Sequence, residues 1–347
     1  MSREPLQTDA GVTRREFLAF SGWLALGATT LGAPLTAQAA RFNRELVQVT
    51  DGRLAMGTFV NMVVFHPSKD QAEQAMGKAF TEMNRLIGVF NCHDGSTPVG
   101  YLNKTGSLRD VSPELYHVLT SALEFNGSTA GAFDITVKPV LDLYEQSFAT
   151  RQGPPEREQI TEALQVVGSN RLKVRRDGVS FLQERMSITL DGIAKGYIVD
   201  RTMSVLRSNG IKHALINAGG DICVTGPRGD GKPWNVGIQD PWHTDETIEV
   251  VELTHGAVAT SGSYEVYFDR EKVYHHIISP RAGLPVSGPV SVSAVAADAV
   301  TADALSTSVF VMGVGKGRAF LEKTSNVAGL IVSSDQRRHY ASWPTKV

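Results

Sequence analysis

The sequence predicts an α+β fold, and three observations support this class. Stretches with strand-like alternation and stretches with helical spacing are interleaved irregularly, without the βαβα order of a parallel sheet. The 33 glycines against 14 phenylalanines indicate many turns and close backbone contacts. No repeat, low-complexity tract or charged linker divides residues 41–347. We therefore expect a single domain over residues 40–347, built from two lobes around a cleft.

The composition and charge are those of an ordinary globular protein. The 347 residues are 42% hydrophobic and 20% charged, and the formal net charge is −2. A protein that binds nucleic acid through its phosphates needs a strongly basic face, and this net charge gives no indication of one. We therefore expect no nucleic-acid partner.

Residues 1–39 have the features of a twin-arginine signal peptide. Arg14 and Arg15 precede a mildly apolar segment, and Ala37-Gln38-Ala39 offers a small-residue cleavage site. A short membrane anchor is the alternative, but glycines interrupt the segment that would have to cross a bilayer. We expect export in the folded state to the periplasm, with no stable membrane span once the signal is removed.

Cysteine usage leaves the redox state open. Cys92 and Cys223 are the two cysteines of the chain, and they lie far apart without CxxC or zinc-type spacing. In an exported protein they can pair or stay free. No cysteine stands at the cleavage region, so we expect no lipid anchor there.

The first elements of the domain follow from local patterns. Alternating residues predict a strand pair within 46–65, and helical spacing of apolar residues predicts a helix over 68–90. A stretch rich in Gly, Asn and Ser over 91–106 is expected to be a loop. A helix is then predicted over 113–127, with a proline at its first position and Ser112 as its N-cap.

The remaining elements alternate between short strands and helices. In order, the sequence predicts a small helix after Pro155, short strands within 171–192, a helix over 194–210 that ends at a glycine, short strands and turns from His213 that include a strand over 272–279, two helices within 299–326, and a final hairpin over 328–342.

The segment 297–313 places polar side chains in an apolar helix. Asp303 and Thr307 are four residues apart, so both lie on one face of the helix, one turn apart. A carboxylate and a hydroxyl in this arrangement can bind a hard cation such as Mg²⁺. The alternative is a solvated aspartate and a threonine that bonds back to its own helix.

The segment "TLDGIAKGY" (189–197) has the pattern of a strand end, a glycine turn and a helix start. Asp191 is expected near the helix N-cap, and Gly192 allows a ligand to approach the backbone. The helix N-terminus and Lys195 together favour an anion such as phosphate. The alternative is a well-capped surface helix.

Two further segments carry polar residues after or within strands. "NAGGD" (217–221) is a glycine turn that ends at Asp221. "YHHIISP" (274–280) places His275 and His276 on one strand, so their side chains face opposite ways. At most one of them can face a given cleft, where it could transfer protons near neutral pH.

Eight segments in order resemble the ApbE family, the FAD:protein FMN transferases. They extend over nearly the whole domain, and their order makes the resemblance specific although no single motif is decisive. The segments are "MGTF" (56–59), "GAFDITVKPV" (131–140), "DGIAKGYIVD" (191–200), "NAGGDI" (217–222), "WNVGIQDP" (234–241), "ATSGSYE" (259–265), "YHHIISPRAG" (274–283) and "TADALSTSVFVMG" (301–313).

This resemblance implies a fold and an activity. Family members are α+β proteins that hold FAD between two lobes with Mg²⁺ at its diphosphate, and they transfer FMN to a threonine of an acceptor flavoprotein. By resemblance, Asp303, Thr307 and the Gly192 carbonyl are the metal ligands, and His276 assists the attacking hydroxyl. The residues assigned to FAD contacts are Met56, Phe90, Ala132, Phe133, Asp134, Thr189, Asp191, Lys195 and Ile277.

The residues are consistent with this chemistry. Attack on a diphosphate requires positioning and charge neutralisation more than a covalent nucleophile. The acceptor threonine would attack the phosphorus of the FMN half, and AMP would leave. A cation bound by Asp303 and Thr307 would explain how an apolar helix tolerates a carboxylate.

The chain also departs from the usual family pattern. Thr189 stands where an acid is usual, and Asp191 follows two places later, whereas Ser279 replaces another acid. Phe90 replaces a tyrosine, and the loop after it is longer than usual. With the twin-arginine signal, these features resemble the NosX-type branch that serves nitrous oxide reduction, whose acceptor is the membrane flavoprotein NosR.

Two other functions remain compatible with the sequence. An FAD pyrophosphatase would differ only in that water attacks instead of a protein hydroxyl. A non-catalytic flavin-binding accessory protein is allowed by the changes at Thr189 and Ser279, and it would bind flavin without releasing AMP.

Overall fold

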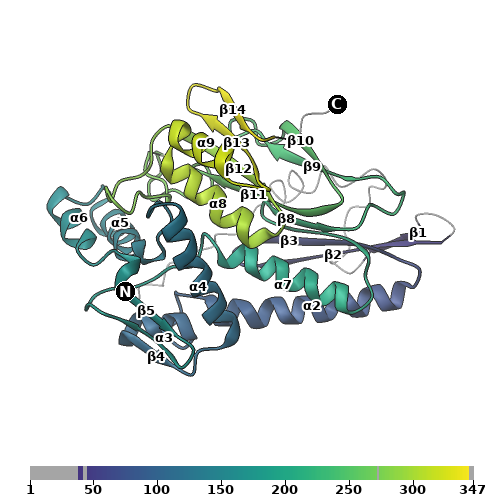
Figure 1. Ribbon diagram of the computed structural model, residues 1–347, viewed down its shortest axis with the longest axis horizontal. Helices are drawn as coiled ribbons and strands as arrows, with labels where there is room; N and C mark the ends of the chain where they lie inside the picture. Colours follow the sequence, from purple (N-terminus) through teal and green to yellow (C-terminus); the bar gives the residue numbers. More distant parts are fainter. Residues whose placement is uncertain (1–37, 42–44, 272, 344–347) are drawn as a thin grey trace, which may run out of the picture.

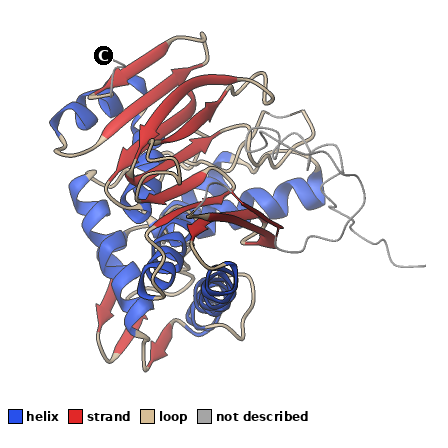
Figure 2. Ribbon diagram, turned by 90° about the vertical axis from the view of Figure 1, so that its right-hand side faces the viewer, coloured by secondary structure: helices blue, strands red, loops and turns tan. Residues whose placement is uncertain are grey.

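A nine-stranded sheet, antiparallel at every adjacent pair, organises the domain. The computed structural model describes residues 38–41, 45–271 and 273–343. The sheet is strongly twisted (Figure 2). In sheet order its strands are β1 (Gln38–Arg41), β2 (Val47–Ala55), β3 (Thr58–His66), β7 (His213–Ala218), β8 (Asp221–Thr225), β11 (His255–Gly262), β12 (Pro289–Ala296), β13 (Ala328–Ser333) and β14 (Arg338–Ala341).

Four helices cover one face of this sheet (Figure 1). They pack in succession, each against the next, and all four contact strands of the sheet. The apolar stripe expected in the first of them is buried against the sheet and its neighbour, with Ala79, Met83 and Leu86 fully enclosed. The helices are α2 (Lys69–Phe90), α7 (Ala194–Ser208), α8 (Ala299–Met312) and α9 (Val314–Lys323).

A hairpin of β9 (Trp234–Gln239) and β10 (Thr247–Leu253) covers the opposite face. Side chains alternate between the two faces along each strand. In β11, Ala257 and Ala259 join the core beneath the helices, whereas Val258 between them joins a second apolar cluster with the hairpin. The central strands are therefore buried on both faces, which explains their continuous apolar character.

The second lobe is mostly helical. Its elements are α3 (Pro98–Thr105), β4 (Ser107–Arg109), α4 (Pro113–Ser128), η1 (Ile135–Val137), α5 (Lys138–Arg151), α6 (Arg157–Leu164), η2 (Ser169–Arg171), β5 (Leu172–Arg175) and β6 (Gly178–Phe181). The three short strands form a separate antiparallel sheet in the order β4-β6-β5.

An irregular segment between β11 and β12, described over residues 263–271 and 273–288, joins the two lobes. The Tyr144 ring of α5 stacks on Phe268, with ring centroids 5.4 Å apart, and the Tyr144 hydroxyl donates to the Gly283 carbonyl at 3.1 Å. Ile278 packs with Tyr144 and with Ile160 of α6. These contacts fix the segment that carries the histidine pair.

Most of the expected elements are confirmed, but two expected strands and one expected loop differ from the structure, and one helix was not expected. The expected strand within 186–192 is not formed, because the Asn103 side chain, and not a neighbouring strand, bonds to the Ile188 backbone N–H and carbonyl. The expected loop 91–106 contains helix α3, which begins after Thr97 and ends at Gly106 with φ of 77°. Helix α5 was missed entirely. In the described part of the expected strand over 272–279, residues 273–279, the structure has isolated bridges in place of a strand: Tyr267 with His275 and Ile278 with Pro285.

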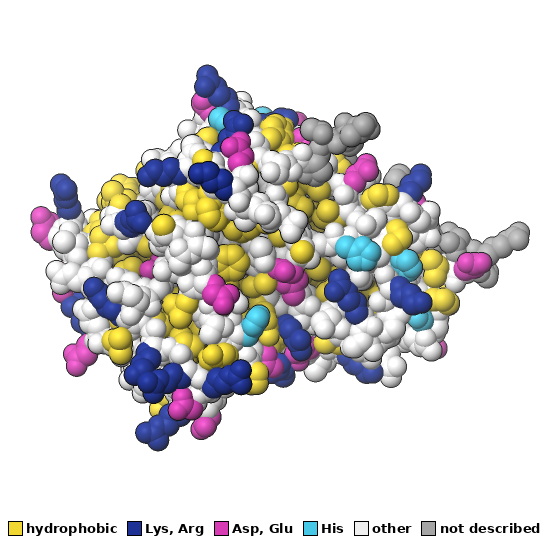
Figure 3. All heavy atoms as spheres, in the orientation of Figure 1, with side chains coloured by type: hydrophobic (Ala, Val, Ile, Leu, Met, Phe, Trp, Pro, Cys, Tyr) yellow, Lys and Arg dark blue, Asp and Glu magenta, His cyan; other side chains and the backbone are white. Residues whose placement is uncertain are grey.

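The signal-peptide prediction lies almost wholly outside the described residues, since 1–37 are not among them. Within the described part of the chain, no helix combines the length and the apolar character needed to cross a bilayer. On the face drawn in Figure 3, basic and acidic side chains are interspersed, without a large patch of one sign.

Candidate active site

The site is built where α7 and α8 cross at close range. Gly196 lies in the first turn of α7, and a Cβ at this position would lie 2.3 Å from the Ala299 carbonyl oxygen of α8. A side chain larger than glycine would therefore separate the two helices. Because they approach so closely, a carboxylate on each helix can reach the N-terminus of the other.

Each helix caps its partner with an aspartate. Asp303 of α8 accepts a hydrogen bond from the Gly196 backbone N–H through Oδ2 at 2.9 Å. Asp200 of α7 accepts from the backbone N–H groups of Ala299 and Val300, both at 2.9 Å. No capping side chain is supplied by Ile193, the N-cap residue of α7. Asp303 therefore satisfies a helix end that would otherwise keep an unpaired donor.

The three residues expected to bind metal come from two segments that meet here. A Cβ on Gly192 would lie 3.1 Å from Thr307 Oγ1, so the Gly192 backbone and the Thr307 hydroxyl are near contact. Asp303 lies one turn before Thr307 on the same helix. The Thr307 hydroxyl also hydrogen-bonds to Ser261 Oγ of β11 at 3.1 Å. The structure therefore brings Asp303, Thr307 and the Gly192 backbone close together.

Three carboxylates around this place act on one lysine. Lys195 Nζ lies 3.5 Å from Asp221 Oδ2, an oxygen that makes no hydrogen bond within the described residues. Burial raises the pKa of Asp303 well above its usual value, and the charge of Asp221 adds to this effect. Burial also raises the pKa of Asp221 and of Glu265.

Lys195 neutralises these negative charges only in part. Burial opposes its charged form, yet the three carboxylates together raise its pKa, with Asp221 as the strongest partner. One ammonium therefore faces three acidic groups in a poorly solvated place. An excess of buried negative charge of this kind is stabilised by an added cation or by protonation.

The adjacent histidines, His275 and His276, have different environments. His275 is 7% exposed. Its Nδ1 accepts from the Ile277 N–H at 3.2 Å, so its Nε2 carries the proton that it donates to the Val286 carbonyl at 2.9 Å. Its ring also packs edge-on against Phe310. His275 therefore holds its segment in the core.

His276 is the histidine that faces the charged groups. Its Nδ1 lies 3.1 Å from the Val266 carbonyl oxygen, which can only accept, so Nδ1 carries the proton. In the neutral ring, Nε2 is then an acceptor, and among the described residues no donor is found for it. Burial lowers the pKa of His276, and Asp191 and Lys195 are among the charges that act on it. Proton acceptance near neutral pH is the chemistry this arrangement allows.

The aromatic residues expected to contact FAD are well packed. Phe90, at the end of α2, meets Tyr197 edge-on with centroids 5.6 Å apart. Phe133 is 3% exposed, and its ring lies 3.2 Å from where a Gly192 Cβ would stand. Phe133 therefore reaches the expected metal ligands, whereas Phe90 supports the start of α7.

The other expected FAD contacts lie around this core. Met56 occupies the β2–β3 turn with φ of 53°, a left-handed conformation that is uncommon for a residue other than glycine. Ala132 lies half-buried in the loop before Phe133, and Ile277 is buried beside His276.

Asp134 has a structural function that the resemblance did not indicate. Its carboxylate accepts from the backbone N–H and hydroxyl of Thr136, from the backbone N–H and hydroxyl of Ser169, and from the Asn126 amide. Five donors leave it little capacity for a ligand. It ties η1 to η2 and so fixes the loop that presents Phe133.

Thr189 and Asp191 act as a pair. The Thr189 hydroxyl donates to Asp191 Oδ2 at 2.6 Å, and the Thr189 backbone N–H donates to the Ile135 carbonyl at 2.9 Å. Thr189 is buried and Asp191 is exposed. The hydroxyl therefore orients a carboxylate at the turn that leads to Gly192.

Sequence reasoning did not assign Asp200, Ser261 or Glu265 to the site, and it treated Asp221 only as a turn residue. Asp221 could have been identified from the sequence, because an aspartate directly after a glycine pair at the start of a strand is suited to a turn that binds a ligand. Asp200 could not have been identified in this way, because its hydrogen-bond partners lie about 100 positions away in the sequence.

The fold and this cluster define a class of protein: a single-domain α+β protein with a buried, oxygen-rich acidic cluster where two helices cross. The comparisons with known proteins specify the family. The model of the ApbE family matches residues 56–331. The chain therefore belongs to the ApbE family, as the eight segments predicted.

Named relatives and solved structures agree with this assignment. A Vibrio cholerae protein named FAD:protein FMN transferase is 33% identical over 263 residues, 74% of this chain and 75% of that protein. One from Treponema pallidum is 32% identical over 308 residues, 82% of this chain and 84% of that protein. A crystal structure of the ApbE protein from Thermotoga maritima has a TM-score of 0.78 at 33% identity, covering 85% of this chain and 97% of that one.

Proposed function

We propose that the protein transfers FMN from FAD to a threonine hydroxyl of an acceptor flavoprotein and releases AMP. The names of its relatives support this reaction. The observation that carries it is the meeting of Gly192, Asp303 and Thr307 at the α7–α8 crossing, with an excess of carboxylates around a single lysine.

We propose Mg²⁺ as the cation of this site, because the donors fit it. A carboxylate, a hydroxyl and a backbone carbonyl are all oxygen ligands, which Mg²⁺ prefers. Asp303 Oδ2 bonds to the Gly196 N–H, and no hydrogen bond to its Oδ1 is found within the described residues. A diphosphate would be repelled by Asp221, Asp303 and Glu265 unless a cation screened them. When bound, Mg²⁺ neutralises charge on the diphosphate.

The residues of this chain then have separate tasks. Nε2 of His276 accepts the proton of the threonine hydroxyl as its oxygen bonds to the phosphorus of the FMN half. The phosphoanhydride bond breaks and AMP leaves. Lys195, in the first turn of α7, adds positive charge to a helix end that already favours phosphate. Phe133 excludes water beside Gly192.

We propose that the reaction takes place in the periplasm after twin-arginine export, with a NosR-type membrane flavoprotein as the acceptor. The signal pattern of residues 1–39 and the absence of a cysteine at its cleavage region support this proposal.

Incubation of the mature protein with FAD, Mg²⁺ and a NosR-type acceptor domain tests the function. The acceptor should gain the mass of FMN less one water, on one threonine. An acceptor in which that threonine is valine is the matched control and should stay unmodified. Bound flavin with neither acceptor modification nor AMP would instead support a binding protein.

A further inference from the structure

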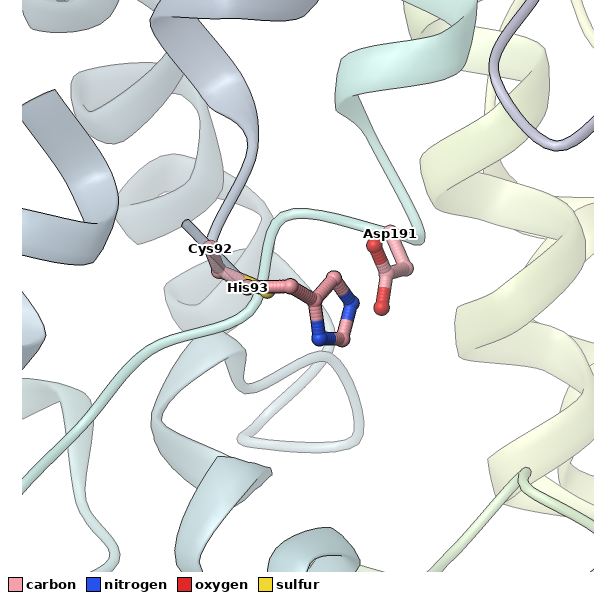
Figure 4. A group of neighbouring side chains, drawn as sticks. All are labelled: Cys92, His93 and Asp191. Carbon is pink, nitrogen blue, oxygen red and sulfur yellow. The ribbon is translucent and has the colours of Figure 1, made fainter. Parts of the chain in front are cut away.

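A second group of potential metal ligands lies beside the proposed flavin site. Cys92 and His93 follow the end of α2, and Asp191 lies on the turn before α7. One ligand atom from each, the Cys92 sulfur, a His93 ring nitrogen and an Asp191 oxygen, lie within 4.8 Å of one another. Figure 4 shows the His93 ring turned towards the Asp191 carboxylate, across the space between the two segments.

Hydrogen bonds hold two of these residues in position. The Thr189 hydroxyl donates to Asp191 Oδ2 at 2.6 Å, and the Cys92 thiol lies 4.0 Å from the same hydroxyl. The His93 backbone N–H donates to Asn91 Oδ1 at 2.9 Å, which fixes the turn after α2. Cys92 is 8% exposed, whereas His93 and Asp191 are exposed. The group is therefore closed on the sulfur side and open to solvent on the other.

We propose that Cys92, His93 and Asp191 form a binding site for a borderline divalent cation of the Zn²⁺ type. Sulfur, nitrogen and carboxylate oxygen are the ligands that Zn²⁺ takes in proteins, and three protein ligands leave a fourth position for water. The oxygen-only set around Asp303 favours a hard cation instead. The two sites therefore differ in the metal they select, although Asp191 and Gly192 are neighbours in the sequence.

A reactive thiol is the competing interpretation of Cys92, and its surroundings argue against it. Burial raises the pKa of the Cys92 thiol, and the charge of Asp191 raises it further. A thiol that stays protonated is a weak nucleophile. A coordinated metal, in contrast, displaces the thiol proton outright. The neighbouring carboxylate, which disfavours a bare thiolate, becomes a further ligand once a cation is present.

Metal binding to the untagged, chelator-treated protein tests this proposal in the absence of FAD and Mg²⁺. Calorimetric titration with Zn²⁺ should show one equivalent per chain. Cys92→Ser and His93→Ala should each weaken this binding by about tenfold or more. With Co²⁺ as the probe, the wild type should show a thiolate-to-cobalt absorption band in the near ultraviolet, and Cys92→Ser should lose it.

Two variants and the second cysteine serve as controls. His93 is exposed, so His93→Ala should fold normally even if Cys92→Ser does not. Asp303→Asn should bind Zn²⁺ as the wild type does, which separates this site from the proposed Mg²⁺ site. Cys223 stays buried in all variants and should give no cobalt band on its own. Wild-type affinity in His93→Ala, or a cobalt band that persists in Cys92→Ser, would overturn the proposal.

Discussion

Asp303 combines a structural contact with the proposed cation site. Its Oδ2 caps α7 through the Gly196 N–H, so a buried carboxylate at this position is explained before any metal is considered. The cap alone leaves the repulsion by Asp221 uncompensated, however. The sequence predicted the pairing with Thr307 from spacing, but it could not predict the cap, because residues 196 and 303 approach only in the folded chain.

Asp303→Asn separates the two functions of this side chain. The amide oxygen can still accept from the Gly196 N–H, while the charge that would bind Mg²⁺ is gone. We expect AMP release to fall by about 100-fold or more. We also expect that Mg²⁺ with FAD raises the thermal midpoint of the wild type but not of this variant, measured by calorimetry.

Asp303→Ala is the matched comparison. It removes the charge and the cap together, so it should lose activity as Asp303→Asn does and should also be less stable than that variant by about 1–3 kcal/mol. Equal activity of Asp303→Asn and wild type would contradict the metal assignment.

His276 should control the acid limb of the pH profile. Burial lowers its pKa, so the neutral, proton-accepting ring persists below the usual histidine value of 6.5. Activity should therefore stay constant on acidification to about neutral pH and fall only below pH 6.5. His276→Gln should be slower by about 100-fold or more and should lack this limb. The measurement is kcat/KM for the acceptor against pH; an unchanged acid limb in the variant would rule out His276 as the base.

At the scale of elements, the α7–α8 crossing positions the site. Local signals predicted both helices, and Asp298 caps α8 through the Thr301 N–H at 2.9 Å as such signals indicate. The crossing itself was not predictable, because it depends on contacts between Gly196 and Ala299 that are about 100 residues apart. Helix α3 was missed for a different reason. Thr97 and Pro98 form the same helix-start signal as Ser112 and Pro113, but they lie in a stretch rich in Gly, Asn and Ser, which was interpreted as a loop.

Gly196→Ala should disturb the crossing. Its Cβ would meet the Ala299 carbonyl oxygen at 2.3 Å and the Val300 Cα at 2.8 Å, and both are backbone atoms that cannot rotate away. We expect a loss of about 1–3 kcal/mol in the free energy of unfolding, measured by urea denaturation, and a marked loss of activity.

Gly88→Ala is the control for this variant. Gly88 is also in a helix, α2, and a Cβ there would meet nothing within 4 Å. This change should leave activity intact and should raise stability by up to about 1 kcal/mol. If both glycine variants behaved alike, close packing at Gly196 would not be what positions the site.

At the scale of the whole molecule, the two lobes meet through the segment 263–288, which carries His276. The α+β class and the single domain were predictable from the irregular order of elements. The strand order was not, since β11 pairs with β8 and β12 across long sequence separations, and hydrophobic alternation does not specify partners. The irregular form of residues 273–279 reflects tertiary contacts with α5 and α6, which override a strand-like pattern.

The proposed twin-arginine export can be tested in cells with the full-length chain. Arg14→Lys with Arg15→Lys should keep the protein in the cytoplasm, because the twin arginines are the recognised feature of this signal. Cell fractionation and immunoblotting check this result. Periplasmic protein in the double variant at the wild-type level would exclude the twin-arginine route.

In the proposed reaction a protein hydroxyl, and not water, accepts the FMN group. The most direct test measures AMP release and covalent flavin together, with FAD and Mg²⁺, in the presence and absence of a NosR-type acceptor domain. We expect AMP and acceptor-bound FMN in a ratio of about one to one, and little AMP without acceptor. AMP released at the same rate without acceptor, and with no covalent flavin when acceptor is present, would contradict it and identify an FAD pyrophosphatase.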